Sequence, residues 1–121
     1  MARIFFGFAV ADGMFAGDCT IIRRALSVEE AIKMIGGEFV EPCLNPSHTA
    51  TIAVMRARFG IDVPIPATPP RVELAIGDSV VVMSVRGLSR LTDRHEYTEE
   101  EVAKATFAFS VYTVSGIDPA A

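Results

Sequence analysis

The chain has 121 residues, of which half are hydrophobic and 21% are charged. This composition is typical of a globular domain and excludes a disordered chain, and no apolar stretch approaches the ~20 residues that a membrane-spanning helix needs. The net charge of −4 disfavours a long DNA or RNA partner, since such ligands are held by a basic face. We therefore expect one α/β domain, residues 1–121, with no membrane partner and only small anionic ligands.

The N-terminal part of the chain predicts two strands. Residues 3–10 are rich in Phe, Ile and Val and end at the turn signal Asp12-Gly13, and residues 19–23 form a second, shorter apolar run. The apolar run in the first strand is only as long as the shortest signal peptide cores, about 7 residues. Cys19 and Cys43 lack the spacing of a metal or redox pair, so we expect buried free thiols in a cytoplasmic protein.

Two helices and a weak strand are predicted next. Residues 27–30, Ser-Val-Glu-Glu, have the form of a capping box, and the glycines at 36 and 37 end the helix that it starts. Residues 38–44 contain a proline and indicate an edge strand. A second helix is expected from His48 to about Phe59, with Gly60 as its C-terminal cap. Its expected apolar stripe consists of Ala50, Ala53, Val54 and Ala57.

The C-terminal half predicts a loop, a hairpin, a short helix and a last strand. Prolines make 61–70 irregular, and the apolar runs 71–76 and 79–85 flank Gly77-Asp78 as in a hairpin. Three glutamates after Thr98 indicate a helix start, and alternating apolar residues over 105–114 indicate a closing strand. The fold class is therefore α/β, a mixed sheet of about five strands flanked by helices.

His48 is the first candidate for chemistry. It follows a Pro-Ser pair at the predicted start of the second helix, where free backbone amides and the helix dipole favour an anion such as phosphate. Histidine exchanges protons near neutral pH, as general acid-base catalysis requires. The alternative is a solvent-facing residue with no task.

A second candidate is the polar connection that follows the apolar strand 79–85. Its arginines suit phosphate binding and stabilisation of transition-state charge, and the alternative is a solvated loop in which Asp93 pairs with a neighbouring arginine. The charged residues of this connection are Arg86, Arg90, Asp93, Arg94 and His95. The chain lacks a Walker or dinucleotide loop, a nucleophile elbow and a metal-spaced cluster, so neither a cofactor nor a metal is expected.

The order of several short motifs resembles a known family. The motifs are ALSVEEA at 25–31, SHTAT at 47–51, FGIDVP at 59–64, RVEL at 71–74 and GD at 77–78. Together they look like the small viral and bacterial ring-nuclease family that includes the type III anti-CRISPR proteins of archaeal viruses. The resemblance implies a homodimer that binds cyclic tetra-adenylate across its two-fold axis and cuts it into linear di-adenylates without a metal.

The resemblance also implies roles for particular residues. It makes His48 the general acid that protonates the leaving 5′-oxygen while a ribose 2′-hydroxyl attacks, with Ser47 where the family has glycine. Arg90 and Asp93 best match the family's arginine and glutamate after the core strand, and Arg86 is the alternative arginine. Phe8 and Ala11 stand where the family has small polar residues. The implied ligand contacts are Ser47, Thr49, Arg86, Phe8 and Ala11.

Three hypotheses about function follow. The first is a metal-independent ring nuclease that degrades a cyclic oligoadenylate and so switches off type III CRISPR antiviral signalling, in the host cytoplasm if the protein is viral. The second is a binding protein that sequesters a cyclic nucleotide signal without cutting it, because the positions of Phe8 and Ala11 are altered. The third is a dimeric interaction module without a nucleotide ligand.

Overall fold

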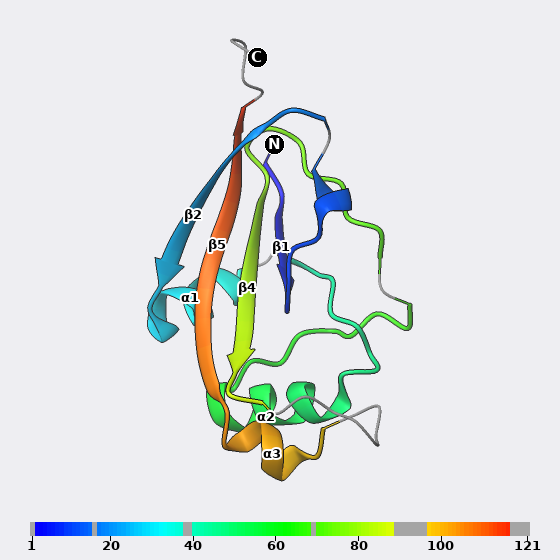
Figure 1. Ribbon diagram of the computed structural model, residues 1–121, viewed down its shortest axis with the longest axis vertical. Helices are drawn as coiled ribbons and strands as arrows, with labels where there is room; N and C mark the ends of the chain where they lie inside the picture. The colour runs from blue at the N-terminus through cyan, green and yellow to red at the C-terminus, as the bar shows by residue number, and fades with distance from the viewer. Residues whose placement is uncertain (1, 16, 38–39, 69, 89–96, 117–121) are drawn as a thin grey trace.

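The computed structural model describes residues 2–15, 17–37, 40–68, 70–88 and 97–116. These form a five-stranded sheet in the order β2-β5-β4-β1-β3, four strands of which are labelled side by side in Figure 1. The predicted fold class, a mixed sheet flanked by helices in one α/β domain, is confirmed. The predicted homodimer stays a prediction.

The sheet combines a parallel and an antiparallel half. Strand β1 (Ile4–Gly7) lies between β3 (Val40–Pro42) and β4 (Ser79–Arg86) and is parallel to both. Strand β5 (Thr106–Gly116) is antiparallel to β4 and to the edge strand β2 (Thr20–Leu26). As predicted from its proline, β3 is short and lies at an edge.

Three helices accompany the strands, and two begin with the predicted chemistry. Helix α1 (Val28–Ile35) starts at a complete capping box made by Ser27 and Glu30, and α3 (Glu99–Ala103) starts at a second one made by Thr98 and Glu101. Helix α2 (Thr49–Phe59) ends at Gly60, whose φ of 66° is left-handed and suits glycine. In Figure 1, α2 and α3 lie together at one end of the strands.

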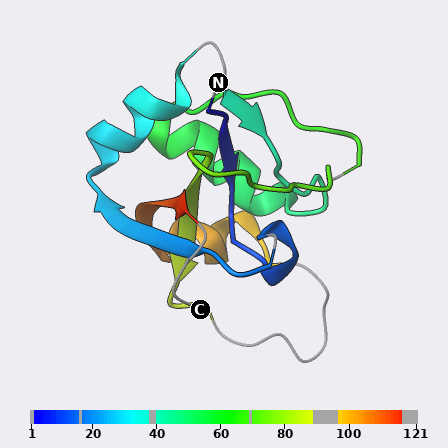
Figure 2. The same cartoon turned by 90° about the horizontal axis from the view of Figure 1, so that it is seen from above.

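Each face of the sheet has its own core. On one face, α1 and α2 pack residues such as Ala31 and Met55 against Phe6 of β1 and Met83 of β4. On the other face, the segments around residues 10–19 and 71–75 cover Phe5, Val80 and Val82. In Figure 2, α1 and the 3-10 turn η1 (Asp12–Met14) lie on opposite sides of β1.

The predicted hairpin of residues 71–76 and 79–85 is wrong. Strand β4 pairs with β1 on one side and β5 on the other, so neither edge is free for residues 71–76. That segment instead covers the second core, where Val72 and Leu74 are buried and Leu74 makes a single bridge with Phe15. The Gly77-Asp78 turn itself is present, with Gly77 at a φ of 92°.

Two smaller expectations also needed correction. Helix α2 buries Ile52, Val54 and Met55, whereas Ala57 of the expected stripe is exposed. The larger side chains face the core because they fill it better than alanine does. Cys19 and Cys43 are free, as expected, but are half-buried rather than buried. In the described part of the chain, no helix is long and apolar enough to cross a membrane.

Candidate active site at the start of helix α2

The segment between β3 and α2 carries His48 past the end of β1. Cys43 continues the pairing beyond β3, because its amide donates to the Phe6 carbonyl at 2.8 Å and its thiol lies 3.2 Å from the same oxygen. Burial raises the pKa of that thiol. Leu44 is buried in the first core. The chain that follows therefore lies at the carboxyl ends of two parallel strands, where α/β proteins commonly bind ligands.

A turn built by Asn45 leads into the helix. The Asn45 side-chain oxygen accepts hydrogen bonds from the Ser47 amide at 2.9 Å and from the Ser47 hydroxyl at 2.8 Å. The Asn45 carbonyl accepts from the His48 amide at 3.1 Å. This is the local side-chain-to-backbone bonding that asparagine favours at turns. The sequence marked the turn, but it gave no role to Asn45, which positions both Ser47 and His48.

His48 is the N-cap of α2 rather than its first helical residue. Its carbonyl accepts from the Ile52 amide at 3.0 Å, and its side chain makes no capping hydrogen bond. The first-turn amides, beginning with Thr49, therefore have no capping side chain among the described residues. These amides and the helix dipole favour a negatively charged group at this position.

Phe8 and His48, both predicted site residues, are brought together. Phe8 follows the last residue of β1, and its ring centroid lies 5.9 Å from that of His48 with the planes inclined by 36°. His48, Ser47 and Thr49 are exposed. The contact places the imidazole beside an aromatic ring at the surface of the first core.

The other described candidates lie elsewhere. Ala11 is exposed and is the N-cap of η1. Arg86 ends β4, and alternation places it on the same face as Val82, which belongs to the second core, whereas Phe8 packs against the first. Within one chain the strand therefore directs Arg86 away from the face that carries Phe8. Four residues of the predicted arginine connection, Arg90, Asp93, Arg94 and His95, lie outside the described residues.

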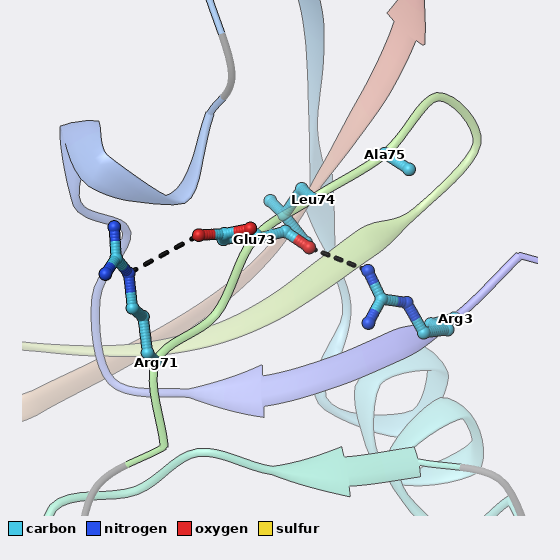
Figure 3. A pocket seen from close by; sticks show the side chains of 5 residues that line it. All are labelled: Arg3, Arg71, Glu73, Leu74 and Ala75. Atoms are coloured by element: carbon cyan, nitrogen blue, oxygen red, sulfur yellow. Dashed lines mark hydrogen bonds and ion pairs between the residues drawn. The ribbon is translucent and has the colours of Figure 1, made fainter.

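A surface hollow of about 480 Å³ lies near the opposite end of β1, lined by Arg3, Arg71, Glu73, Leu74 and Ala75. Figure 3 shows its two arginines on either side of Glu73. The Arg3 guanidinium donates to the Glu73 carbonyl at 2.7 Å and to the buried Asp78 carboxylate at 2.8 Å, and Arg71 lies 3.4 Å from the Glu73 carboxylate. The charges that line this hollow therefore already have partners within the chain.

Asp78 is the centre of that network. It is 2% exposed and also accepts from the amides of Arg3 and Ala75, each at 2.9 Å. Burial by itself would raise the pKa of this carboxyl, but these hydrogen bonds and the Arg3 charge outweigh burial and hold the pKa below its ordinary value of 3.8. Among the described residues, no three His, Cys, Asp or Glu side chains are grouped as a metal site would need.

Comparison with known proteins identifies the fold. No protein-family model matches the chain, and no curated protein matches its sequence. Among solved structures, the chain is similar to B116 of Sulfolobus turreted icosahedral virus (STIV), with a TM-score of 0.65 over 93% of this chain and 99% of that chain. The two sequences are 15% identical, so the likeness shows a shared fold with a viral protein.

Proposed function

We propose that this protein is a metal-independent ring nuclease that binds a cyclic oligoadenylate, with cyclic tetra-adenylate as the first substrate to test, and cleaves it. The observation that carries the proposal is the placement of His48. Its exposed imidazole stands at an uncapped helix start, beyond the ends of two parallel strands, and hydrogen-bonds to no described residue. The motif order supports the same function, and the likeness to a viral protein is compatible with it.

The proposed reaction is an internal transfer at phosphorus. A ribose 2′-hydroxyl gives its proton to solvent water and its oxygen bonds to the adjacent phosphorus, while the bond from that phosphorus to the 5′-oxygen breaks, which leaves a 2′,3′-cyclic phosphate at the cut end. His48 donates its proton to the departing 5′-oxygen, while the first-turn amides of α2 face the phosphate charge. In this proposal Arg90 stabilises the negative charge of the phosphate. Asp93 occupies the acidic position that accompanies this arginine in the family resemblance. The products are linear di-adenylates.

The proposed assembly is a homodimer. A ring with two-fold symmetry is most simply held by a C2 pair, which presents each site residue twice. Light scattering of the protein with and without cyclic tetra-adenylate tests this assembly, and a dimer is expected in the presence of the ring. A monomer under both conditions would overturn the shared pocket.

The decisive experiment incubates excess purified protein with labelled cyclic tetra-adenylate and a chelator. Linear di-adenylates are expected, and they should form at the same rate without the chelator. An intact ring after long incubation would overturn the catalytic proposal. Arg90→Ala should weaken both binding and cleavage, because phosphate charge is present before and during the reaction.

The second candidate function is sequestration of a cyclic nucleotide. It is favoured by the side-chain alternation of β4, which places Arg86 on the sheet face opposite Phe8. Arg86 is therefore not available beside His48 within one chain to stabilise the charge of the transition state. If this function is correct, calorimetry should give tight binding of cyclic tetra-adenylate without turnover. Rapid cleavage would exclude it. Failure to bind any ring in a panel of cyclic oligonucleotides would instead favour an interaction module.

A further inference from the structure

The His48 imidazole is held by a ring contact rather than by a hydrogen bond. Histidines that transfer protons are usually oriented by a hydrogen bond to their second ring nitrogen. In the described part of the chain, the interaction of this imidazole is with Phe8, at a centroid distance of 5.9 Å and an interplanar angle of 36°. Among the described residues, therefore, no hydrogen-bond partner engages either ring nitrogen, and the imidazole lies beside the Phe8 ring.

Phe8 is itself fixed from the core. Its ring meets that of Phe6 edge to face, at 6.4 Å and 83°, which is a favourable aromatic geometry. Phe6 is 0% exposed and sits in β1, between two parallel neighbours. Close packing holds such a side chain in one rotamer. The aromatic series Phe6-Phe8-His48 thus runs from the centre of the first core to the start of α2.

We infer that Phe8 is a positioning residue for His48: it fixes the plane of the imidazole so that a ring nitrogen faces the ligand position at the helix start. An aromatic face also attracts a cation, so the contact persists when the imidazole carries its extra proton. The catalytic meaning of this role rests on the proposed function. The orientation of the imidazole does not rest on the proposed function, because it is a property of the ligand-free protein.

The first test measures orientation by NMR in the ligand-free protein. Phe8→Leu removes the ring that shifts the His48 side-chain proton resonances, so these should move toward the positions of a solvent-exposed histidine. Phe8→Tyr should leave them near their wild-type positions. The matched control is Phe107→Leu, because Phe107 is also half-buried and in aromatic contact, with Phe59 at the other end of α2. This control should not move the His48 resonances.

The second test measures cleavage of cyclic tetra-adenylate by the same variants. Phe8→Leu should lower kcat about tenfold and change KM by a smaller factor, since a misplaced acid slows the chemical step, whereas the loss of a direct contact between Phe8 and the ligand raises KM. Phe8→Tyr should restore kcat, and Phe107→Leu should retain it. A variant that lost activity through poor folding would instead show a lowered melting temperature.

The outcomes separate the two proposals. His48 resonances that do not change in Phe8→Leu would overturn the inference, whatever the activity. Changed resonances with a wild-type kcat would overturn the positioning role in catalysis. A wild-type protein that never cleaves the ring would overturn the proposed function, and the NMR result would still decide whether Phe8 orients His48.

Discussion

The two ends of strand β1 show opposite ways of treating polar groups. Before β1, Arg3 meets Asp78, and the buried carboxylate accepts hydrogen bonds from two amides and a guanidinium. Beyond β1, the His48 imidazole meets an aromatic ring and has no hydrogen-bond partner among the described residues. The first arrangement holds the fold together, because its polar groups satisfy one another. The second leaves polar groups available, as a ligand site requires.

The hollow beside Arg3 illustrates the same difference. This hollow is a concavity of about 480 Å³ lined by two arginines, Arg3 and Arg71. The partners of these arginines are Asp78 and Glu73 of the same chain. An anion that entered it would have to displace these carboxylates or bind beside them. The charged groups of this hollow are therefore paired within the chain, whereas the His48 imidazole has no hydrogen-bond partner among the described residues.

The largest expected effect is on cleavage by His48→Ala. Loss of a general acid costs about 10² to 10⁴ in rate, whereas the exposed position at the helix start should change the free energy of unfolding by less than about 0.5 kcal/mol. Single-turnover cleavage at saturating enzyme measures the rate, and calorimetry should show retained ring binding. His95→Ala is run in parallel. An unchanged rate for His48→Ala, or a loss only for His95→Ala, would assign the chemistry to the other histidine.

The opposite result is expected at the other end of β1. Asp78→Asn should lower the free energy of unfolding by about 3 kcal/mol, because it leaves Arg3 without its charge partner and removes a buried acceptor. Ring binding by the folded variant should be unchanged. Glu73→Gln is the control, since Glu73 is 71% exposed in its pair with Arg71 and should change stability by less than about 0.5 kcal/mol. Urea denaturation measures both. Equal effects would contradict the structural role of Asp78.

The same carboxylate predicts how stability depends on pH. The pKa of Asp78 is lower in the folded protein than in the unfolded chain, so its contribution is present above the unfolded value and is lost as pH falls through the folded value. The difference in unfolding free energy between wild type and Asp78→Asn should therefore be largest near neutral pH and shrink below about pH 4. A difference that stayed constant down to pH 2 would show that the charge of Asp78 is not the source of stability.

The smallest effects compare two helix starts. Ser27 caps α1 with its hydroxyl in a complete capping box, so Ser27→Ala should cost about 1 kcal/mol. Ser47 is exposed, and its hydroxyl donates to the Asn45 side chain rather than capping the helix, so Ser47→Ala should cost less than about 0.5 kcal/mol. Thermal unfolding measured by circular dichroism gives both values. A larger cost at Ser47 would mean that the His48 turn is held as firmly as the start of α1.

Local chemistry explains which elements could be predicted from the sequence. The capping box at Ser27, the acidic helix start after Thr98 and the glycine after Phe59 act within one turn of their own helices, and all three appear where expected. The structure adds a capping box at Thr98. The hairpin at 71–85 failed because a strand's choice of neighbour is not local: β4 takes β1 and β5, which are distant in the sequence. The predicted apolar stripe of α2 was wrong at Ala57, which is exposed, for a similar reason. Which side chains of a helix face the core depends on what packs against the helix.

The candidate site divides along the same line. The sequence by itself determined the helix between His48 and Gly60, with its start placed one residue early, because the turn residues before it and Gly60 after it act on their immediate neighbours. Only the tertiary structure decided that Phe8 contacts His48 and that Arg86 lies on the other face of the sheet. It also decided that Asp78 forms a buried ion pair with Arg3. These outcomes depend on strand order and on which face each side chain takes, and both are set by packing between segments far apart in the chain.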